Sequence, residues 1–193
     1  MTKERTKIRR KRTAHRTIRR KRATTNPSTR VFQVHAGSGQ AGKPAVAWIA
    51  SPNFASRQGT KINTLVLHNT DTTLSKAITR FKDPASQVSA HYLVDRDGSI
   101  TQMVSDSDTA WHSRKKEVNQ ESIGIEVVAW NTAAGTTPPQ EASLVQLCKY
   151  LLDAYAVDLA RVLPHRAIKP TDCPGWVWPT DQDFVTWKNT KLV

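Results

Sequence analysis

Apolar and polar residues follow one another along most of the chain in patterns that predict both strands and helices. Leu65, Val66 and Leu67 form a continuous apolar run, which is typical of a strand covered on both faces of its sheet. Between residues 140 and 157, large apolar residues recur every three or four positions, which predicts a long amphipathic helix. The first 30 residues hold only three large apolar residues and cannot build a core.

Shorter patterns predict the remaining elements and set the fold class. Apolar runs bounded by turn residues indicate strands, and apolar residues at helical spacing after a capping threonine indicate helices. We expect a short strand at 45–50, a strand ending at His68, a helix at 74–81, a hairpin of strands at 91–95 and 99–104, a strand at 123–128 and a short helix opening at 180–183. Strands mixed with helices at these spacings indicate an α/β domain with a mixed sheet.

Charge divides the chain into a basic tail, residues 1–30, and a nearly neutral domain, residues 31–193. The tail carries 13 Lys and Arg residues against one acid, Glu4, and so supplies +12 of the net charge of +13. We expect this tail to be disordered when unbound. No apolar stretch follows its basic residues, which argues against a secretory signal, and no run of about 18 apolar residues predicts a transmembrane helix.

The partner of the basic tail stays open at this point. It is either a solvated extension or a segment that attaches to a polyanion: an anionic envelope polymer such as teichoic acid or lipopolysaccharide, an anionic lipid, or a nucleic acid. The first 30 residues contain no aromatic side chain, so base stacking is not supported. Nucleic acid is therefore the weakest of these candidates.

Two histidines and a cysteine offer a candidate zinc site. His68 ends a predicted buried strand, where a sheet opens to solvent, and His165 and Cys173 lie in the proline-rich segment 163–175, which predicts an ordered loop. Three protein ligands leave one tetrahedral position for water, as in catalytic zinc sites. No compact metal motif is present, so unliganded histidines remain the alternative. The other cysteine, Cys148, falls in the predicted long helix and is expected in the core.

A series of motifs, in one order, resembles the zinc-dependent N-acetylmuramoyl-L-alanine amidases, which include phage lysins, muropeptide-recycling amidases and peptidoglycan recognition proteins. The resemblance covers roughly residues 48–180 and implies a central mixed sheet flanked by helices in a single amidase domain. The motifs are Ser51-Pro52-Asn53-Phe54, Arg57, the strand to His68, the segment 88–98, Ala110-Trp111-His112, Ser122-Ile123-Gly124-Ile125-Glu126 and Thr171-Asp172-Cys173-Pro174-Gly175.

The resemblance also implies roles for individual residues. It makes His68, His165 and Cys173 the zinc ligands, although Asp172 competes because the recycling amidases use aspartate in this loop. Glu126 matches the acid/base glutamate of these enzymes, with a sheet glutamate on the solvent face as the alternative. Thr171 takes the position from which many relatives stabilise the oxyanion with lysine; Lys169 compensates only if it reaches the site. His91 is expected to be structural, and Asn69, Trp111 and His112 are candidates for substrate binding.

The implied activity is hydrolysis of the amide between N-acetylmuramic acid and L-alanine in peptidoglycan, with zinc-activated water as nucleophile. The lack of a signal favours a bacteriolytic phage or prophage endolysin, made in the cytoplasm and released to the cell wall by a holin. A cytosolic muropeptide-recycling amidase and a non-catalytic peptidoglycan-binding module are the alternatives.

Overall fold

A computed structural model describes residues 42–130 and 135–193 of the chain. The predicted basic tail and its boundary with the domain at residue 30 lie outside the described residues. Within the described ranges, no helix combines the length and the apolar character needed to cross a bilayer.

Six strands form one mixed sheet in the order β1-β5-β4-β7-β3-β8. Strands β4 and β5 pair antiparallel, as the predicted hairpin requires, and the other neighbouring pairs are parallel. A separate antiparallel pair consists of β2 (Phe54–Ser56) and β6 (Asp108–Ala110). The strands of the large sheet are β1 (Ala47–Trp48), β3 (Thr64–Asn69), β4 (Tyr92–Val94), β5 (Ile100–Gln102), β7 (Ser122–Val127) and β8 (Val162–Pro164). The predicted mixed α/β fold is confirmed.

Capping threonines begin several of the helices, and the sequence predicted the first of them. Thr73 accepts a hydrogen bond from the Lys76 backbone N–H at the start of α1, and Thr137 forms a capping box with Gln140 at the start of α3. The helices are α1 (Leu74–Lys82), α2 (Lys116–Glu121), α3 (Pro138–Tyr155) and α4 (Asp181–Lys191), with single 3-10 turns at η1 (Pro84–Ser86), η2 (Leu159–Arg161) and η3 (His165–Ala167).

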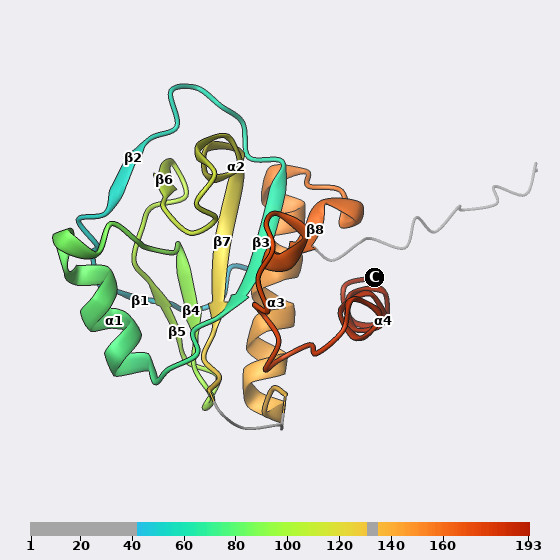
Figure 1. Ribbon diagram of the computed structural model, residues 1–193. Helices are drawn as coiled ribbons and strands as arrows, with labels where there is room; N and C mark the ends of the chain where they lie inside the picture. The colour runs from blue at the N-terminus through green and yellow to red at the C-terminus, as the bar shows by residue number, and fades with distance from the viewer. Residues whose placement is uncertain (1–41, 131–134) are drawn as a thin grey trace, which may run out of the picture. The chain divides into compact units, whose positions relative to one another are not determined.

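Each face of the sheet buries its own apolar cluster, and helices cover both faces (Figure 1). One face packs against α3 and α4, and its core includes Leu65, Leu67, Ile123 and Ile125 together with Leu144, Leu147, Leu151, Trp178, Phe184 and Trp187. The opposite face packs against α1 through a smaller cluster of Ala77, Phe81, Ala90, Leu93 and Met103. The smaller cluster leaves part of this second face uncovered for a site.

The structure corrects the sequence prediction in several short segments. The strands β2 and β6, of three residues each, and the six-residue helix α2 were not predicted, because such short segments carry too little periodicity to be recognised. The segment 163–175, predicted as loop throughout, begins with the end of β8 at Pro164. A proline is tolerated there because β8 is an edge strand, so its missing N–H costs no ladder hydrogen bond.

Candidate metal and catalytic site

Strand alternation brings a histidine and a glutamate side by side. In the parallel β3–β7 pair, His68 lies opposite Glu126. Successive side chains of a strand point to opposite faces. Leu67 and Ile125 therefore enter the larger core, whereas His68 and Glu126 both point to the face that α1 partly covers. The sequence alternation thus fixes the relative placement of these two polar groups.

The three predicted ligands converge from two parts of the chain. Candidate ligand atoms of His68, His165 and Cys173 lie within 4.8 Å of one another. His68 Nδ1 is 3.8 Å from Cys173 Sγ, and the His68 and His165 rings are 4.4 Å apart between centroids. His165 opens η3 directly after β8, which pairs with β3. Asp172 is exposed and is not a member of this cluster.

The chemistry of the three side chains fits a zinc ion. His165 Nε2 is buried and has no hydrogen-bond partner in the part of the chain that the structure describes, so this ring nitrogen is available to a metal. Burial, followed by the nearby imidazoles of His112 and His165, lowers the pKa of His68 well below its ordinary value. Metals bind the neutral imidazole, which this environment favours. Two imidazoles and a thiol also match the donors that zinc prefers.

The Cys173 thiol needs a cation to ionise. Burial, and then the charge of Glu126, raises the pKa of Cys173 to about 12. The Asn69 backbone N–H approaches the sulfur at 3.3 Å and partly opposes this effect. A bound divalent cation deprotonates a coordinating thiol outright. The Cys173 environment therefore disfavours a free thiolate and suits a metal-bound one.

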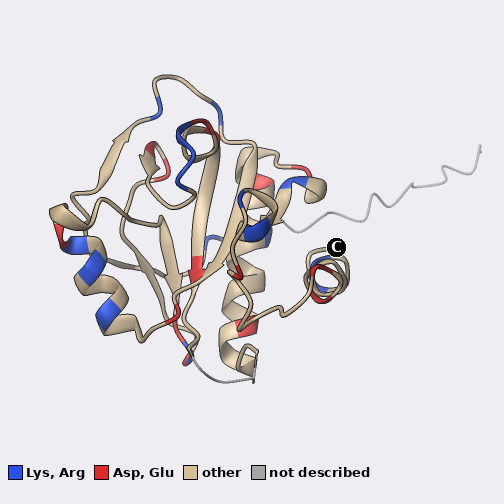
Figure 2. Cartoon of the chain, in the orientation of Figure 1, with Lys and Arg blue, Asp and Glu red and all other residues tan. Residues whose placement is uncertain are grey.

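The Glu126 carboxyl group lies beside the cluster. Its side chain is partly buried, and within residues 42–130 and 135–193 no group forms a hydrogen bond with its enclosed Oε2. Burial raises the pKa of Glu126 to about 8, against a smaller lowering by the positive charge of Arg80. Glu126 is the acidic residue within β7. Figure 2 shows acidic colour on β7 and basic colour on α1. A carboxyl group that titrates near neutral pH suits general acid–base chemistry.

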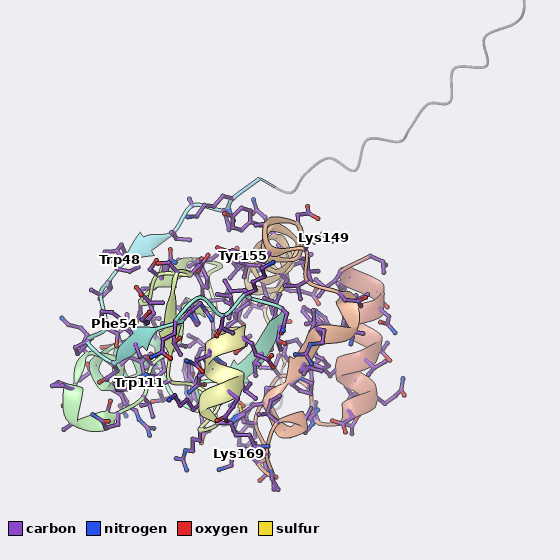
Figure 3. All side chains as sticks on the ribbon, turned by 90° about the horizontal axis from the view of Figure 1, so that it is seen from above. Trp48, Phe54, Trp111, Lys149, Tyr155 and Lys169 are labelled. Atoms are coloured by element: carbon purple, nitrogen blue, oxygen red, sulfur yellow. The ribbon has the colours of Figure 1, made fainter. Side chains whose placement is uncertain are left out.

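A cleft of about 380 Å³ joins these groups. It is lined by the expected ligands and the expected catalytic and substrate-binding residues: His68, Asn69, Trp111, His112, Glu126, His165, Thr171 and Cys173. Trp111 and Lys169, labelled in Figure 3, border it from distant segments of the chain. The structure thus brings the predicted site residues together in one place, while the role of each stays a prediction.

The model of the N-acetylmuramoyl-L-alanine amidase family matches residues 58–176, which is more than half of the chain. The chain belongs to this family. All of the clustered residues just described fall within the matched range.

Relatives in the amidase family match over part of their length. The chain is 38% identical over 78 residues to N-acetylmuramoyl-L-alanine amidase A of Achromobacter lyticus, covering 40% of this chain and 43% of the relative. It is 34% identical over 91 residues to the 1,6-anhydro-N-acetylmuramyl-L-alanine amidase AmpD of Haemophilus influenzae, covering 44% of this chain and 49% of the relative. The chain therefore spans less than half the length of each of these two relatives.

A solved structure of an amidase shares the fold. The catalytic domain of XlyA aligns with a TM-score of 0.62 at 23% identity, covering 78% of this chain and 100% of that domain. At this level of identity the likeness concerns the arrangement of helices and strands. It agrees with the mixed sheet and flanking helices described above.

Sequence reasoning missed several residues of this amidase site. Arg80 and Arg114 line the cleft beside Lys169, yet a lone arginine on an exposed helix or loop gives no signal of its own. Gly124 lies between Ser122 and Glu126 on the same face of β7. Its importance depends on the side chain that packs over it, which is His112. His91 is fully buried and accepts a hydrogen bond from the Gly124 N–H, in agreement with the structural role expected for it.

His112 makes contacts that the sequence did not predict. Its ring is 8% exposed, and both of its nitrogens lie within hydrogen-bond distance of protein groups. One contact is to His68 and the other to Ser122. Substrate binding by His112 stays a prediction, and the contact with a candidate zinc ligand adds a second possible role.

Proposed function

We propose that the protein is a zinc-dependent amidase that hydrolyses the bond between the lactyl group of N-acetylmuramic acid and L-alanine in peptidoglycan. One observation carries the proposal: three candidate metal ligands converge beside Glu126, whose buried Oε2 has no hydrogen-bond partner among the described residues. Membership of the amidase family and 38% identity to a relative named N-acetylmuramoyl-L-alanine amidase A support this reaction.

The residues of the cleft have two proposed roles: three would bind zinc, and one transfers protons. His68, His165 and Cys173 would hold zinc, which when bound lowers the pKa of a water molecule to about 7 and polarises a carbonyl oxygen. The Glu126 carboxylate accepts a proton from the attacking water and returns it to the departing alanine nitrogen. Burial raises the pKa of Glu126 to about 8 in the zinc-free protein, and a bound cation would favour its carboxylate form, which is the form that accepts the proton.

Thr171 offers a hydrogen bond to the oxyanion that develops on the lactyl carbonyl. Its hydroxyl oxygen accepts a hydrogen bond from the Cys173 backbone N–H at 3.3 Å, which leaves the hydroxyl hydrogen free to donate. The hydroxyl also borders the cleft. A donor already held in place costs little reorganisation when charge develops on the substrate oxygen.

Three cations surround the proposed substrate cleft. Arg80, Arg114 and Lys169 border it from α1 and from two loops. Within residues 42–130 and 135–193, none of these side chains forms an ion pair. Such a rim attracts anionic groups of a peptide or glycan into the cleft. We infer that the substrate carries at least one carboxylate close to the scissile amide.

Two physiological substrates are candidates for the proposed amidase. The +12 charge of residues 1–30 favours an endolysin that acts on intact, anionic cell wall as the first candidate. The identity to AmpD of Haemophilus influenzae favours a soluble 1,6-anhydro-muropeptide as second candidate. Cys173 takes the position at which the recycling amidases use aspartate. This difference favours the wall-degrading enzyme.

Digestion of purified substrates tests this proposal. We expect the full chain to release L-alanyl peptides from purified sacculi, detected by mass spectrometry, and to lose this activity with a zinc chelator and regain it with Zn²⁺. Glu126→Gln should lower kcat by at least about a hundredfold, the usual contribution of a general base. Glu117→Gln, an exposed glutamate on α2, is the matched control and should retain wild-type activity.

The outcomes separate the candidates. Binding of sacculi without any release of peptide would refute the amidase and favour a binding module. Release from soluble anhydro-muropeptide but not from sacculi would favour the recycling enzyme. Full activity of Glu126→Gln would remove Glu126 from the proposed mechanism.

A further inference from the structure

A buried chain of hydrogen-bonding groups leads from the candidate ligand His68 into the protein interior. His68 Nε2 lies 3.1 Å from His112 Nδ1, and His112 Nε2 lies 3.0 Å from Ser122 Oγ. The Ser122 hydroxyl is 2.5 Å from the backbone carbonyl of Val118. His68, His112 and Ser122 are each at most 8% exposed, so water does not compete freely for these bonds.

The direction of these hydrogen bonds follows from their last member. The Val118 carbonyl can only accept, so the single Ser122 hydroxyl hydrogen is donated to it. Ser122 Oγ must then accept from His112 Nε2–H, which leaves Nδ1 of the neutral His112 ring as an acceptor. That nitrogen can pair only with a His68 ring that carries its hydrogen on Nε2.

The resulting tautomer places the free lone pair of His68 on the ring nitrogen that faces the candidate metal position. With its hydrogen on Nε2, the neutral His68 ring has its free lone pair on Nδ1. This Nδ1 atom is the one that faces Cys173, 3.8 Å from the sulfur. The opposite tautomer would place an N–H bond toward the candidate metal position and prevent coordination.

The shape of β7 supports the same arrangement independently. A Cβ atom built on Gly124 would lie 2.4 Å from His112 Cγ and 2.5 Å from Cδ2, closer than real Cβ contacts allow. Glycine inside a strand weakens it and often marks a close approach of another group. The absence of a side chain at this position of β7 is therefore what gives the His112 ring room to lie against the strand.

We propose that His112 is a positioning residue that fixes the metal-binding tautomer and orientation of His68, with Ser122 fixing the tautomer of His112 in turn. The inference rests on the proposed function only in taking His68 as a metal ligand. Outer partners of a ligating histidine typically change metal affinity by about 10- to 100-fold. His112 thus contributes to the site without touching the metal or the reacting atoms.

Long-range ¹H–¹⁵N spectra of the full chain labelled with ¹⁵N-histidine test the tautomers directly. With Zn²⁺ bound, we expect His68 and His112 both to carry hydrogen on Nε2. A hydrogen on His112 Nδ1, or zinc on His68 Nε2, would overturn the inference. If the wild-type protein binds no zinc, the proposed function fails, and the tautomers are then read from the zinc-free protein with the same criteria.

Zinc affinity, measured by competition with a chromogenic chelator, gives a second readout. His112→Phe keeps the ring shape but not the acceptor, and it should weaken zinc binding by about 10- to 100-fold. His112→Asn places an amide oxygen near the former Nδ1 and should restore most of this loss. Equal affinity of the wild type and His112→Phe, or equal loss in Asn and Phe, would contradict the proposed hydrogen bond.

Two further variants separate positioning from folding. Gly124→Ala should displace the His112 ring and weaken zinc binding, and Ser122→Ala should do so to a smaller degree. Ser51→Ala is the matched control, because Ser51 is also a buried serine that donates to a backbone carbonyl at 2.5 Å, and its hydroxyl is bonded to Phe81 and Asn53 rather than to His68 or His112. Ser51→Ala should lower the unfolding midpoint as Ser122→Ala does and leave zinc affinity unchanged; an equal affinity loss in both would refute a specific role.

Discussion

Replacing Glu126 by glutamine should stabilise the zinc-free protein in a manner that depends on pH. The pKa of Glu126 in the folded state is about 8, above its ordinary value of 4.5, and burial is the main cause. Below pH 4.5 the Glu126 carboxyl group is protonated in both the folded and the unfolded state, so it does not lower the free energy of unfolding. As pH rises toward 8, the unfolded chain releases this proton while the folded protein keeps it, so the free energy of unfolding falls. Above pH 8 the penalty is constant.

The size of the effect follows from this pKa difference. A tenfold difference in proton affinity corresponds to about 1.4 kcal/mol, so three pH units between 5 and 8 amount to about 4 kcal/mol. Water that enters the cleft beside this partly buried side chain reduces the penalty, and we expect about 2–4 kcal/mol. Glutamine has nearly the same shape and does not ionise, so Glu126→Gln should lack this loss of stability.

Urea unfolding of both proteins in a chelator, at integer pH values from about 5 to about 9 so as to span the pKa, measures the effect. Other titrating groups are common to both proteins, so the difference between their profiles isolates Glu126. The stability gain of Glu126→Gln should grow with pH and level off above pH 8. Parallel profiles would show that the carboxyl group is hydrated in the folded state, and would refute its burial. Zinc should diminish the difference, because a nearby cation favours the carboxylate.

Three further predictions concern the ligands, the cationic rim and the tail. Cys173→Ser should lose most zinc affinity in chelator competition while keeping its far-UV circular dichroism; unchanged affinity would remove the thiolate from the ligand set. Arg80→Gln should raise KM for an anionic muropeptide without a matching fall in kcat, whereas Lys82→Gln, exposed on the same helix, should not. Deleting residues 1–30 should abolish salt-sensitive binding to anionic envelope while sparing cleavage of soluble muropeptide, and salt-independent binding by the full chain would contradict this.

The strand and the helix that flank the site could be predicted from the sequence because each depends on a local pattern of apolar and capping residues. A continuous apolar run predicts β3 and a threonine-capped amphipathic pattern predicts α1, and both predictions are confirmed at nearly the same residues. Burial on both faces of a central strand requires apolar residues at consecutive positions, so a polar His68 at the strand end stands out. The convergence of His165 and Cys173 on it came from resemblance, since spacing alone does not encode a contact across about a hundred residues.

The contacts around the ligands could not be read from sequence for a physical reason. Whether His112 faces substrate or His68 depends on how the loop after β6 folds back over β7, which no periodicity reports. Gly124 likewise reads as a weak strand position until the ring above it is known. Arg80 reaches the cleft because α1 packs beside it through Ala77 and Phe81, a tertiary arrangement rather than a helical pattern.

Three features of the metal-free fold are unfavourable, and one cation would relieve all of them. Glu126 Oε2 and His165 Nε2 are buried and have no hydrogen-bond partner among the residues described, and burial opposes ionisation of the Cys173 thiol. Each such group costs free energy in an apolar environment unless it is paired. A divalent ion would accept the lone pair of His165, stabilise the thiolate and favour the nearby carboxylate at once. These favourable interactions with the ion exist only in the folded chain, so zinc should raise the free energy of unfolding. The size of this increase and the zinc affinity should therefore change together when the site is altered.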